Sequence, residues 1–323
     1  MKSLPRIEIA HLPTPIEEMP RLSAHLGGPR LLIKRDDQTG LAFGGNKTRK
    51  LEYLVAEALA QGARTLVTAG AVQSNHCRQT AAAAARLGLD CILVLVGNPQ
   101  ESPSGNYLLD LLLGAEVVWA RSWETRHDDL QAAFEAAREQ GRKPYFIPYG
   151  GSNATGAAGY AFAMQELVSQ GVEADWVVFP SSSGGTQAGM VAGARLFGFE
   201  GRILGISVDE PESVLKERVA RLATETARLL GEDVSFSADE IFVDAGYTGE
   251  GYGVMNARDR EAVQLFARYE GLLVDPVYTG RAAGGMIDLI RKGFFSSHET
   301  VLFWHTGGTP ALLASKYRHV LED

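Results

Sequence analysis

The stretch Gly44-Gly45-Asn46-Lys47-Thr48-Arg49-Lys50 places a lysine directly after a glycine turn, at the start of an amphipathic segment. Glycine tolerates positive φ angles and lets the backbone approach a ligand closely. The first N–H groups of a helix attract an anion. A second cation, Arg49 or Lys50, follows within one turn, and such a neighbour lowers the pKa of an amine that must act as a nucleophile. An ordinary surface lysine is the alternative for this motif taken by itself.

Composition limits the classes of protein that need to be considered. The chain has 323 residues, of which 45% are hydrophobic and 22% charged, as in globular proteins with a substantial core. A net charge of -8 argues against nucleic acid or an anionic membrane as the main partner. Cys77 and Cys91 form neither a disulfide framework nor a metal-binding cluster, so we expect no metal. No run approaches the roughly 20 apolar residues of a membrane span, and we expect a cytoplasmic enzyme.

Short β-branched runs alternate with longer amphipathic stretches along most of the chain. This alternation predicts an α/β fold with two open, mostly parallel sheets flanked by helices, and a cleft between two lobes. The predicted strands cover residues 31–34, 65–68, 91–96, 116–119, 145–147, 176–179, 203–208 and 301–304. The predicted helices cover residues 47–61, 75–87, a segment from 105, and residues 128–140, 157–168, 186–197, 212–230, 258–269 and 280–291.

Ligands of open α/β sheets bind where the strands end at their carboxyl side. After the strand at 176–179, Ser183, Gly184, Gly185 and Thr186 open a helix. Their backbone N–H groups and hydroxyls predict a nest for a phosphate, with a flexible Ser/Gly turn as the alternative. The stretch has neither the Walker A pattern nor the GxGxxG spacing, so nucleotide binding is poorly supported.

Three other loops carry polar or aromatic side chains. Gln73-Ser74-Asn75-His76 follows the strand at 65–68; Ser74 is a good helix cap, yet the turn offers more hydrogen bonds than a cap needs. It could bind a substrate carboxylate and the phenolic oxygen of a cofactor. Tyrosines and a threonine stand beside glycines farther along the chain, where they could face a ligand or line the core. They are Tyr247, Tyr252, Tyr278 and Thr306.

A nucleophilic lysine, a phosphate nest, a carboxylate-binding turn and aromatic loops together describe a pyridoxal phosphate site. The chain resembles the fold-type II pyridoxal phosphate enzymes, which are similar to the tryptophan synthase β subunit, in the branch of D-cysteine desulfhydrase and 1-aminocyclopropane-1-carboxylate (ACC) deaminase. The resemblance runs nearly end to end. The motifs that carry it are Leu12-Pro13-Thr14-Pro15, Lys34-Arg35-Asp36-Asp37, the stretches 44–53 and 73–80, Gly150-Gly151-Ser152-Asn153, and the stretches 183–189, 275–280 and 305–309.

The resemblance implies roles for individual residues. Lys47 looks like the lysine that forms a Schiff base with pyridoxal 5'-phosphate, and Lys50 should help hold the phosphate together with Ser183 to Thr186. Asn75 resembles the residue that bonds the phenolic oxygen. Ser74 resembles the one that meets the substrate carboxylate or assists proton transfer, next to His76. Tyr252 and Tyr278 match two active-site tyrosines. The resemblance further implies a large cofactor-binding domain of residues 1–48 and 160–323, a small domain of residues 49–159, and a homodimer.

Two threonines favour a desulfhydrase over a deaminase. In the deaminases a glutamate follows the second tyrosine and keeps the pyridine nitrogen protonated, which strengthens the electron sink needed to open a cyclopropane. This chain has Thr279 there, and Thr306 where the deaminases more often have an apolar residue. A hydroxyl leaves the nitrogen largely neutral, which suffices for β-elimination. His76 also resembles the desulfhydrases. We therefore predict a lyase of amino-acid metabolism that converts D-cysteine to pyruvate, hydrogen sulfide and ammonia.

Other activities stay open at this point. The scaffold also resembles enzymes that release sulfite from L-cysteate. A sulfonate leaving group should want an added cationic contact, for which Arg78 and His76 are the candidates. ACC deaminase comes next, and a non-catalytic pyridoxal phosphate-binding protein is the alternative from another class. The group that removes the Cα proton is left open between Lys47, Ser74 and a tyrosine, because it depends on the hand of the substrate.

Overall fold

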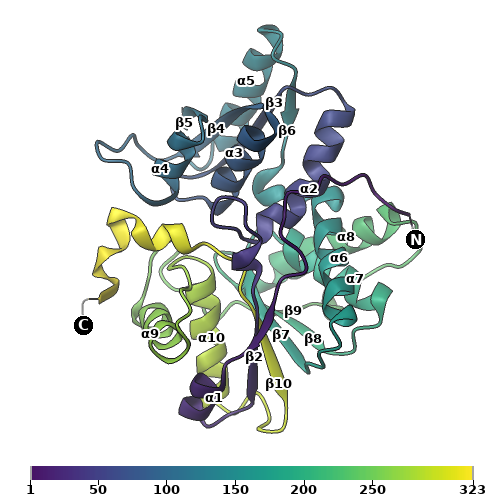
Figure 1. The fold of residues 1–323 in the computed structure, drawn as a ribbon, viewed down its shortest axis with the longest axis vertical. Coiled ribbons are helices and arrows are strands. Elements are labelled where there is room, and N and C mark those ends of the chain that lie inside the picture. The colour runs from purple at the N-terminus through teal and green to yellow at the C-terminus, as the bar shows by residue number, and fades with distance from the viewer. Residues whose placement is uncertain (1, 322–323) are drawn as a thin grey trace.

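The computed structural model describes residues 2–321, which form two β-sheets joined through helix α2 (Asn46–Ala60) (Figure 1). The strand order is β1-β2-β10-β7-β8-β9 in the large sheet and β5-β4-β3-β6 in the small one. Strand β1 is antiparallel to β2, and the other described pairs are parallel. The predicted fold class is therefore confirmed. The strands are β1 (Ile16–Glu18), β2 (Arg30–Lys34), β3 (Thr65–Ala71), β4 (Asp90–Val96), β5 (Glu116–Ala120), β6 (Pro144–Phe146), β7 (Trp176–Ser181), β8 (Arg202–Ser207), β9 (Phe242–Asp244) and β10 (Thr300–Trp304).

Helices cover both faces of the large sheet because its strands are apolar on both faces. In β2, Leu31 and Ile33 pack into the core cluster shared with helix α10, whereas Leu32 between them packs into the cluster shared with α6. Figure 1 shows one group of helices beside β7 and β8 and the other beside β2 and β10. The first group is α6 (Ala154–Ser169), α7 (Gly185–Phe197) and α8 (Glu212–Leu229), and the second is α1 (Pro20–Leu26), α9 (Ala257–Leu265) and α10 (Thr279–Arg291).

The small sheet is layered in the same way. Helices α2, α3 (Asn75–Leu87) and α4 (Gly105–Leu112) pack on one face, and α5 (Arg126–Glu139) packs on the other. Strand β4 lies between β3 and β5, and its apolar run is buried, as the sequence predicts for an interior parallel strand.

The structure adds short elements that the sequence did not predict, namely β1, β9 and α1. Strands β1 and β9 have three residues each and include charged residues, unlike the equally short β6, so only their pairing reveals them. The helix predicted at 258–269 is α9 followed by a π-helical turn at Phe266–Glu270. Both predicted domain boundaries would fall inside continuous helices, α2 and α6, and the division into two domains stays a prediction.

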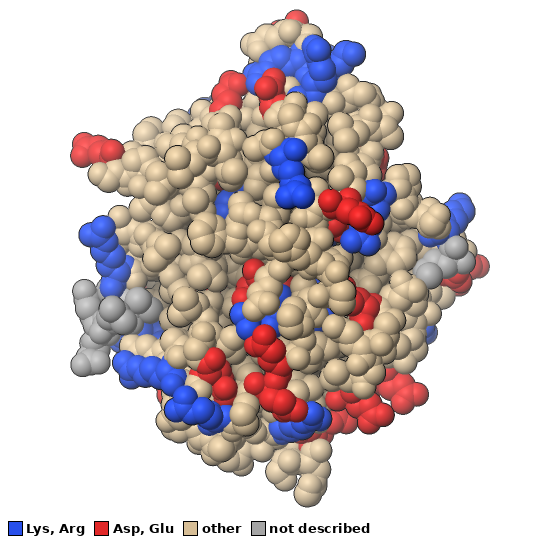
Figure 2. Space-filling model, viewed as in Figure 1, with Lys and Arg blue, Asp and Glu red and all other residues tan. Residues whose placement is uncertain are grey.

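The surface and the helices add two observations. On the face shown in Figure 2, basic side chains lie in small groups beside acidic ones rather than in one broad patch. No helix within residues 2–321 is long and apolar enough to span a membrane.

Candidate active site

A cavity lies at the N-terminus of α2, where loops that follow strands of both sheets converge. It is walled by the loops after β3, β6, β7 and β10, which all leave their strands at the carboxyl end. Most of the predicted site residues are among those that line it. The lining residues are Asn46, Lys47, Ser74, Asn75, His76, Tyr149, Gly150, Pro180, Ser181, Ser182, Ser183, Gly184, Thr186, Tyr278 and Thr306.

Lys47 is the second residue of α2 and is half-buried in this cavity. Gly44 and Gly45 both have positive φ angles, and a Cβ atom on Gly45 would lie 2.6 Å from Nε2 of Gln79. Glycine is therefore required where the helix starts. The Lys47 ammonium donates to the Gly150 carbonyl oxygen at 3.1 Å. Burial lowers the pKa of Lys47 to about 8, as a nucleophilic amine requires.

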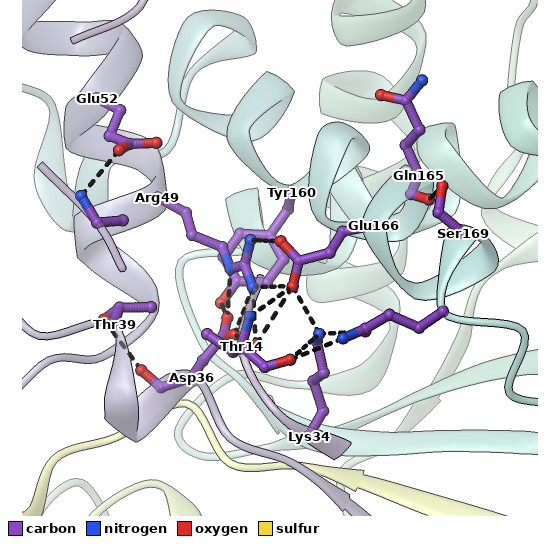
Figure 3. Close-up of polar contacts among 12 residues, drawn as sticks. Thr14, Lys34, Asp36, Thr39, Arg49, Glu52, Tyr160, Gln165, Glu166 and Ser169 are labelled. Carbon is purple, nitrogen blue, oxygen red and sulfur yellow. Dashed lines mark hydrogen bonds and ion pairs between the residues drawn. The ribbon is translucent and has the colours of Figure 1, made fainter. Parts of the chain in front are cut away.

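Lys50 lies one turn along α2 and donates to the same Gly150 oxygen, also at 3.1 Å. Its side chain is buried, and burial together with the charge of Lys47 holds the pKa of Lys50 well below its ordinary value. Among the described residues, neither lysine forms an ion pair with a carboxylate. Arg49 instead pairs with Asp36 and Glu166, so Lys50 is the second cation of the motif (Figure 3).

The loop at the N-terminus of α7 gathers hydrogen-bonding groups around Ser152. The Ser152 hydroxyl lies 2.8 Å from that of Ser183, accepts from the Gly185 N–H at 3.2 Å and lies 3.4 Å from the Lys50 ammonium. Gly184 has a φ of +83°, and a Cβ atom on Gly185 would lie 2.6 Å from the Ser152 hydroxyl. Serine hydroxyls, a helix N-terminus and a lysine form a site suited to an anion.

The polar turn after β3 presents three side chains to the cavity. Ser74 caps α3 by accepting from the Cys77 N–H at 3.2 Å, as predicted. Asn75 is 8% exposed, and its Oδ1 accepts from Nδ2 of Asn106 at 2.8 Å. His76 is bound through Nε2 to the Thr68 hydroxyl at 2.9 Å. Burial holds the pKa of His76 well below its ordinary value, so its ring is neutral near pH 7.

Two tyrosines meet across the edge of the cavity. Tyr278 lines the cavity, Tyr252 lines an adjoining hollow with Tyr149 and Arg126, and the two hydroxyls lie 2.6 Å apart. Burial raises the pKa values of Tyr252 and Tyr278, so both stay protonated near neutral pH. Tyr247, in contrast, belongs to the core of the large sheet and donates to Asp288.

Residues 7–307 match the family described as pyridoxal-phosphate dependent enzymes. The chain belongs to this family. It is 42% identical over 344 aligned positions to the 1-aminocyclopropane-1-carboxylate deaminase of Burkholderia vietnamiensis, which covers 100% of the chain and 99% of that relative. It is 43% identical to the D-cysteine desulfhydrase of Klebsiella pneumoniae over 96% of each. The crystal structure of an ACC deaminase homologue superposes with a TM-score of 0.87 at 39% identity, over 96% of this chain and 94% of that one.

These comparisons confirm the predicted branch of pyridoxal phosphate enzymes and the cofactor. They do not separate the two activities, because relatives with different names match at 42% and 43% identity.

The cavity fits pyridoxal phosphate on its own geometry. Within residues 2–321, the Lys47 and Lys50 amines converge on one carbonyl oxygen and neither pairs with a carboxylate, so the site suits an anion. The backbone at Gly150 lies close to the side chains expected to bind the cofactor. A Cβ atom on Gly150 would lie 2.5 Å from the Ser183 hydroxyl and 3.4 Å from the Lys47 amine. The binding of the phosphate by the Ser183–Thr186 loop with Lys50, and of the aldehyde by Lys47, stays a prediction that this geometry supports.

The two threonines predicted near the pyridine nitrogen have different surroundings. Thr306 follows β10 and lines the cavity. Thr279 is fully buried, is not among the lining residues, and donates its hydroxyl to Asp275 at 2.7 Å. The contact of Thr279 with the cofactor stays a prediction.

Three groups of the site were not assigned a role from the sequence. Tyr149, the Gly150 carbonyl and the Ser152 hydroxyl all belong to the loop after β6. The motif Gly150-Gly151-Ser152-Asn153 was noted only as part of the resemblance. An aromatic residue and a glycine pair directly after a strand, at Tyr149-Gly150-Gly151, are the signal that could have found them.

Proposed function

We propose that this enzyme catalyses β-elimination on D-cysteine and releases hydrogen sulfide, pyruvate and ammonia. The observation that carries the proposal is the composition of the cavity wall: among the described residues that line it there is no aspartate or glutamate, and Thr306 offers a hydroxyl. A carboxylate would keep the pyridine nitrogen protonated, as ring opening of a cyclopropane demands. A hydroxyl leaves it neutral, and elimination of a good leaving group tolerates that weaker electron sink.

The charge around His76 favours a thiol over a sulfonate as the leaving group. The Thr68 hydroxyl donates its one proton to the Ile147 carbonyl oxygen at 2.9 Å, so it must accept from Nε2 of His76. Nε2 of His76 therefore carries a proton, and because burial holds the pKa of His76 well below its ordinary value, the ring is neutral near pH 7. Arg78 is fully buried, does not line the cavity and donates to the Gly44 carbonyl oxygen at 2.7 Å. Neither residue offers the added cation that a sulfonate would want.

When bound, pyridoxal phosphate supplies an electron sink for the carbanion that forms when the Cα proton is lost. Lys47 holds the cofactor until substrate displaces it, and its amine, with a pKa of about 8, is then the proposed base for the Cα proton. The Ser74–Asn75 turn holds the substrate carboxylate. Tyr252 and Tyr278, which stay protonated, are proposed to donate hydrogen bonds rather than to remove a proton.

The test is a substrate panel assayed with the enzyme loaded with pyridoxal phosphate. D-cysteine, L-cysteine, L-cysteate, β-chloro-D-alanine and ACC are compared by kcat/KM, with pyruvate, ammonia, sulfide and sulfite measured separately. We expect D-cysteine to give equal amounts of pyruvate and sulfide with the highest kcat/KM among the natural amino acids. The proposal fails if ACC or L-cysteate is turned over faster than D-cysteine.

ACC deamination is the second candidate, because the Tyr252–Tyr278 pair matches two active-site tyrosines of that group. It would show itself as ammonia and 2-oxobutanoate from ACC. A cofactor-loaded protein that turns over no member of the panel would instead favour a binding function. The homodimer and the cytoplasmic location stay predictions alongside these activities.

A further inference from the structure

Asn75 lines the cavity, and its amide is held from behind by a residue that does not. Asn106, the second residue of α4, is fully buried and absent from the cavity wall. Its Nδ2 atom donates to Oδ1 of Asn75 at 2.8 Å and to the Gln73 carbonyl oxygen at 2.9 Å. Asn106 therefore contacts the side chain that the cofactor is expected to meet.

These contacts determine which end of the Asn75 amide faces the cavity. A backbone carbonyl only accepts hydrogen bonds, so the Asn106 atom that contacts Gln73 O must be the NH₂ group. The same NH₂ group faces Asn75, and therefore the Asn75 atom opposite must be the oxygen. The NH₂ group of Asn75 is consequently turned away from Asn106.

A second set of hydrogen bonds holds the backbone of Asn106 and the side chain of Gln73 in place. The Asn106 backbone N–H donates to Oε1 of Gln73 at 2.8 Å, and Nε2 of Gln73 donates to the Ser104 carbonyl oxygen at 3.0 Å. Gly105, with a φ of +58°, makes room for this packing, since a Cβ atom there would lie 2.4 Å from Oε1 of Gln73. The side-chain NH₂ groups of Asn106 and Gln73 thus both donate to backbone carbonyl oxygens.

The donor end of Asn75 lies at the loop that follows β10. A Cβ atom on Gly308 would lie 2.8 Å from Nδ2 of Asn75, so glycine is required for this approach. Within residues 2–321, no hydrogen bond is formed by that Nδ2 atom, which leaves it to donate to an acceptor in the cavity. The phenolic oxygen of pyridoxal phosphate is such an acceptor.

We propose that Asn106 is a positioning residue, which holds the NH₂ group of Asn75 toward the phenolic oxygen of bound pyridoxal phosphate. This inference rests on the proposed contact of Asn75 with the cofactor and does not depend on which amino acid is the substrate.

The test compares Asn106→Asp with Asn106→Ala in the absence of substrate. The aspartate has the shape of asparagine, but its ionised carboxylate cannot donate, so Asn75 should turn its NH₂ group toward it and present oxygen to the cofactor. Alanine leaves Asn75 free to adopt either orientation. We expect the Kd for pyridoxal phosphate to rise about tenfold or more in Asn106→Asp and by less in Asn106→Ala. The absorption band of the bound cofactor should shift in the same order.

The controls separate positioning from a loss of packing. Asp110 lies one turn from Asn106 on α4, and the cation that acts on Asp110 is Arg78 on α3. Because these charges affect the titration of the carboxyl group introduced by Asn106→Asp, the spectra are recorded from about pH 6 to about pH 9 to include its ionised form. Asn256→Asp serves as a matched control, because Asn256 caps α9 through an oxygen that aspartate retains. Thermal unfolding checks that each variant is folded.

The outcomes are distinct. A larger effect in Asn106→Asp than in Asn106→Ala, with Asn75→Ala at least as strong, supports the proposal. An equal or larger effect in Asn106→Ala, or wild-type spectra and affinity in both, overturns it. If Asn75→Ala itself leaves the spectrum unchanged, the Asn75 contact and this proposal fail together. The D-cysteine proposal is then still decided by the substrate panel.

Discussion

Helix α2 carries cations on two opposite faces, and their surroundings differ. On one face, Arg49 donates to Asp36 at 2.8 Å and to Glu166 at 2.9 Å, and Lys34 from β2 donates to Glu166 at 2.6 Å (Figure 3). Two cations are balanced by two carboxylates. Burial alone would raise the pKa of Asp36, yet the charge of Arg49 holds that pKa below its ordinary value.

On the other face, Lys47 and Lys50 share one carbonyl oxygen, and no carboxylate of the described part of the chain pairs with either. Arg49 lies two residues from Lys47, which at 100° per residue places it on the far side of the helix. Arg49 is neutralised by carboxylates of the protein and therefore holds α2 in position. The Lys47–Lys50 pair has no such counter-ion among residues 2–321 and is suited to bind an anionic ligand. The Arg49 network therefore orients α2 so that Lys47 lines the cavity and both lysines reach the Gly150 carbonyl oxygen beside it.

The largest effect is expected for Lys47→Ala. Removal of the amine eliminates covalent attachment of the cofactor and the proposed base, so kcat/KM should fall by about a thousandfold or more. Lys292→Ala is the matched control, because the Lys292 side chain, directly after the end of α10, is 64% exposed. Retained pyruvate formation, with the visible absorption of the bound cofactor unchanged, would refute the role of Lys47.

Replacement of Arg49 tests the face of α2 on which Arg49 pairs with Asp36 and Glu166. Arg49→Met leaves the buried Asp36 carboxylate without its cation, while Glu166 keeps Lys34, and should lower the free energy of unfolding by about 3–5 kcal/mol. Arg30→Met removes an ion pair whose side chains are 57% and 52% exposed, and there the loss should stay below about 1 kcal/mol. Urea unfolding of the apoenzyme measures both. Equal losses in the two variants would mean that the buried network does not stabilise the fold.

Lys50→Met should have the opposite pattern to Arg49→Met. The Kd for pyridoxal phosphate should rise about 10- to 100-fold, because a charge-assisted hydrogen bond to the phosphate is lost. The stability of the apoenzyme should not fall, because a buried cation without a carboxylate is removed. Equilibrium dialysis and urea unfolding measure the two quantities, with Lys216→Met on the surface of α8 as the control. An unchanged Kd would contradict the assignment of Lys50 to the phosphate.

The sequence was sufficient for those parts of the site that small residues mark. Ser74 and Ser183 could be placed because small polar residues follow apolar strands, and Lys47 because a glycine pair precedes its helix. Long, mostly apolar strands such as β4 were equally clear. The three-residue strands β1 and β9 were not predicted, because their existence depends on pairing with β2 and β8.

Other features of the site depend on contacts between segments that are far apart in the sequence, and the sequence did not predict them. Thr279 and Thr306 each directly precede a glycine, yet Thr279 donates its hydroxyl to Asp275, whereas Thr306 lines the cavity. The Ser152 hydroxyl reaches Ser183 only because the loops after β6 and β7, which belong to different sheets, are brought together. No local pattern contains that information.

The smallest effect concerns the pH dependence of cofactor attachment to the apoenzyme. The free amine of Lys47 must attack the aldehyde, and burial lowers the pKa of Lys47 to about 8 from its ordinary value of 10.5. Below about pH 8 the rate should therefore rise about tenfold per pH unit, and above it the rate should level off, because the amine is already deprotonated. Stopped-flow absorbance measures the rate, and a lysine side chain in a blocked peptide serves as the reference. A rate that keeps rising to about pH 10, as for the peptide, would show that the pKa of Lys47 is not lowered. The difference between the two faces of α2 would then have no consequence for the reactivity of Lys47.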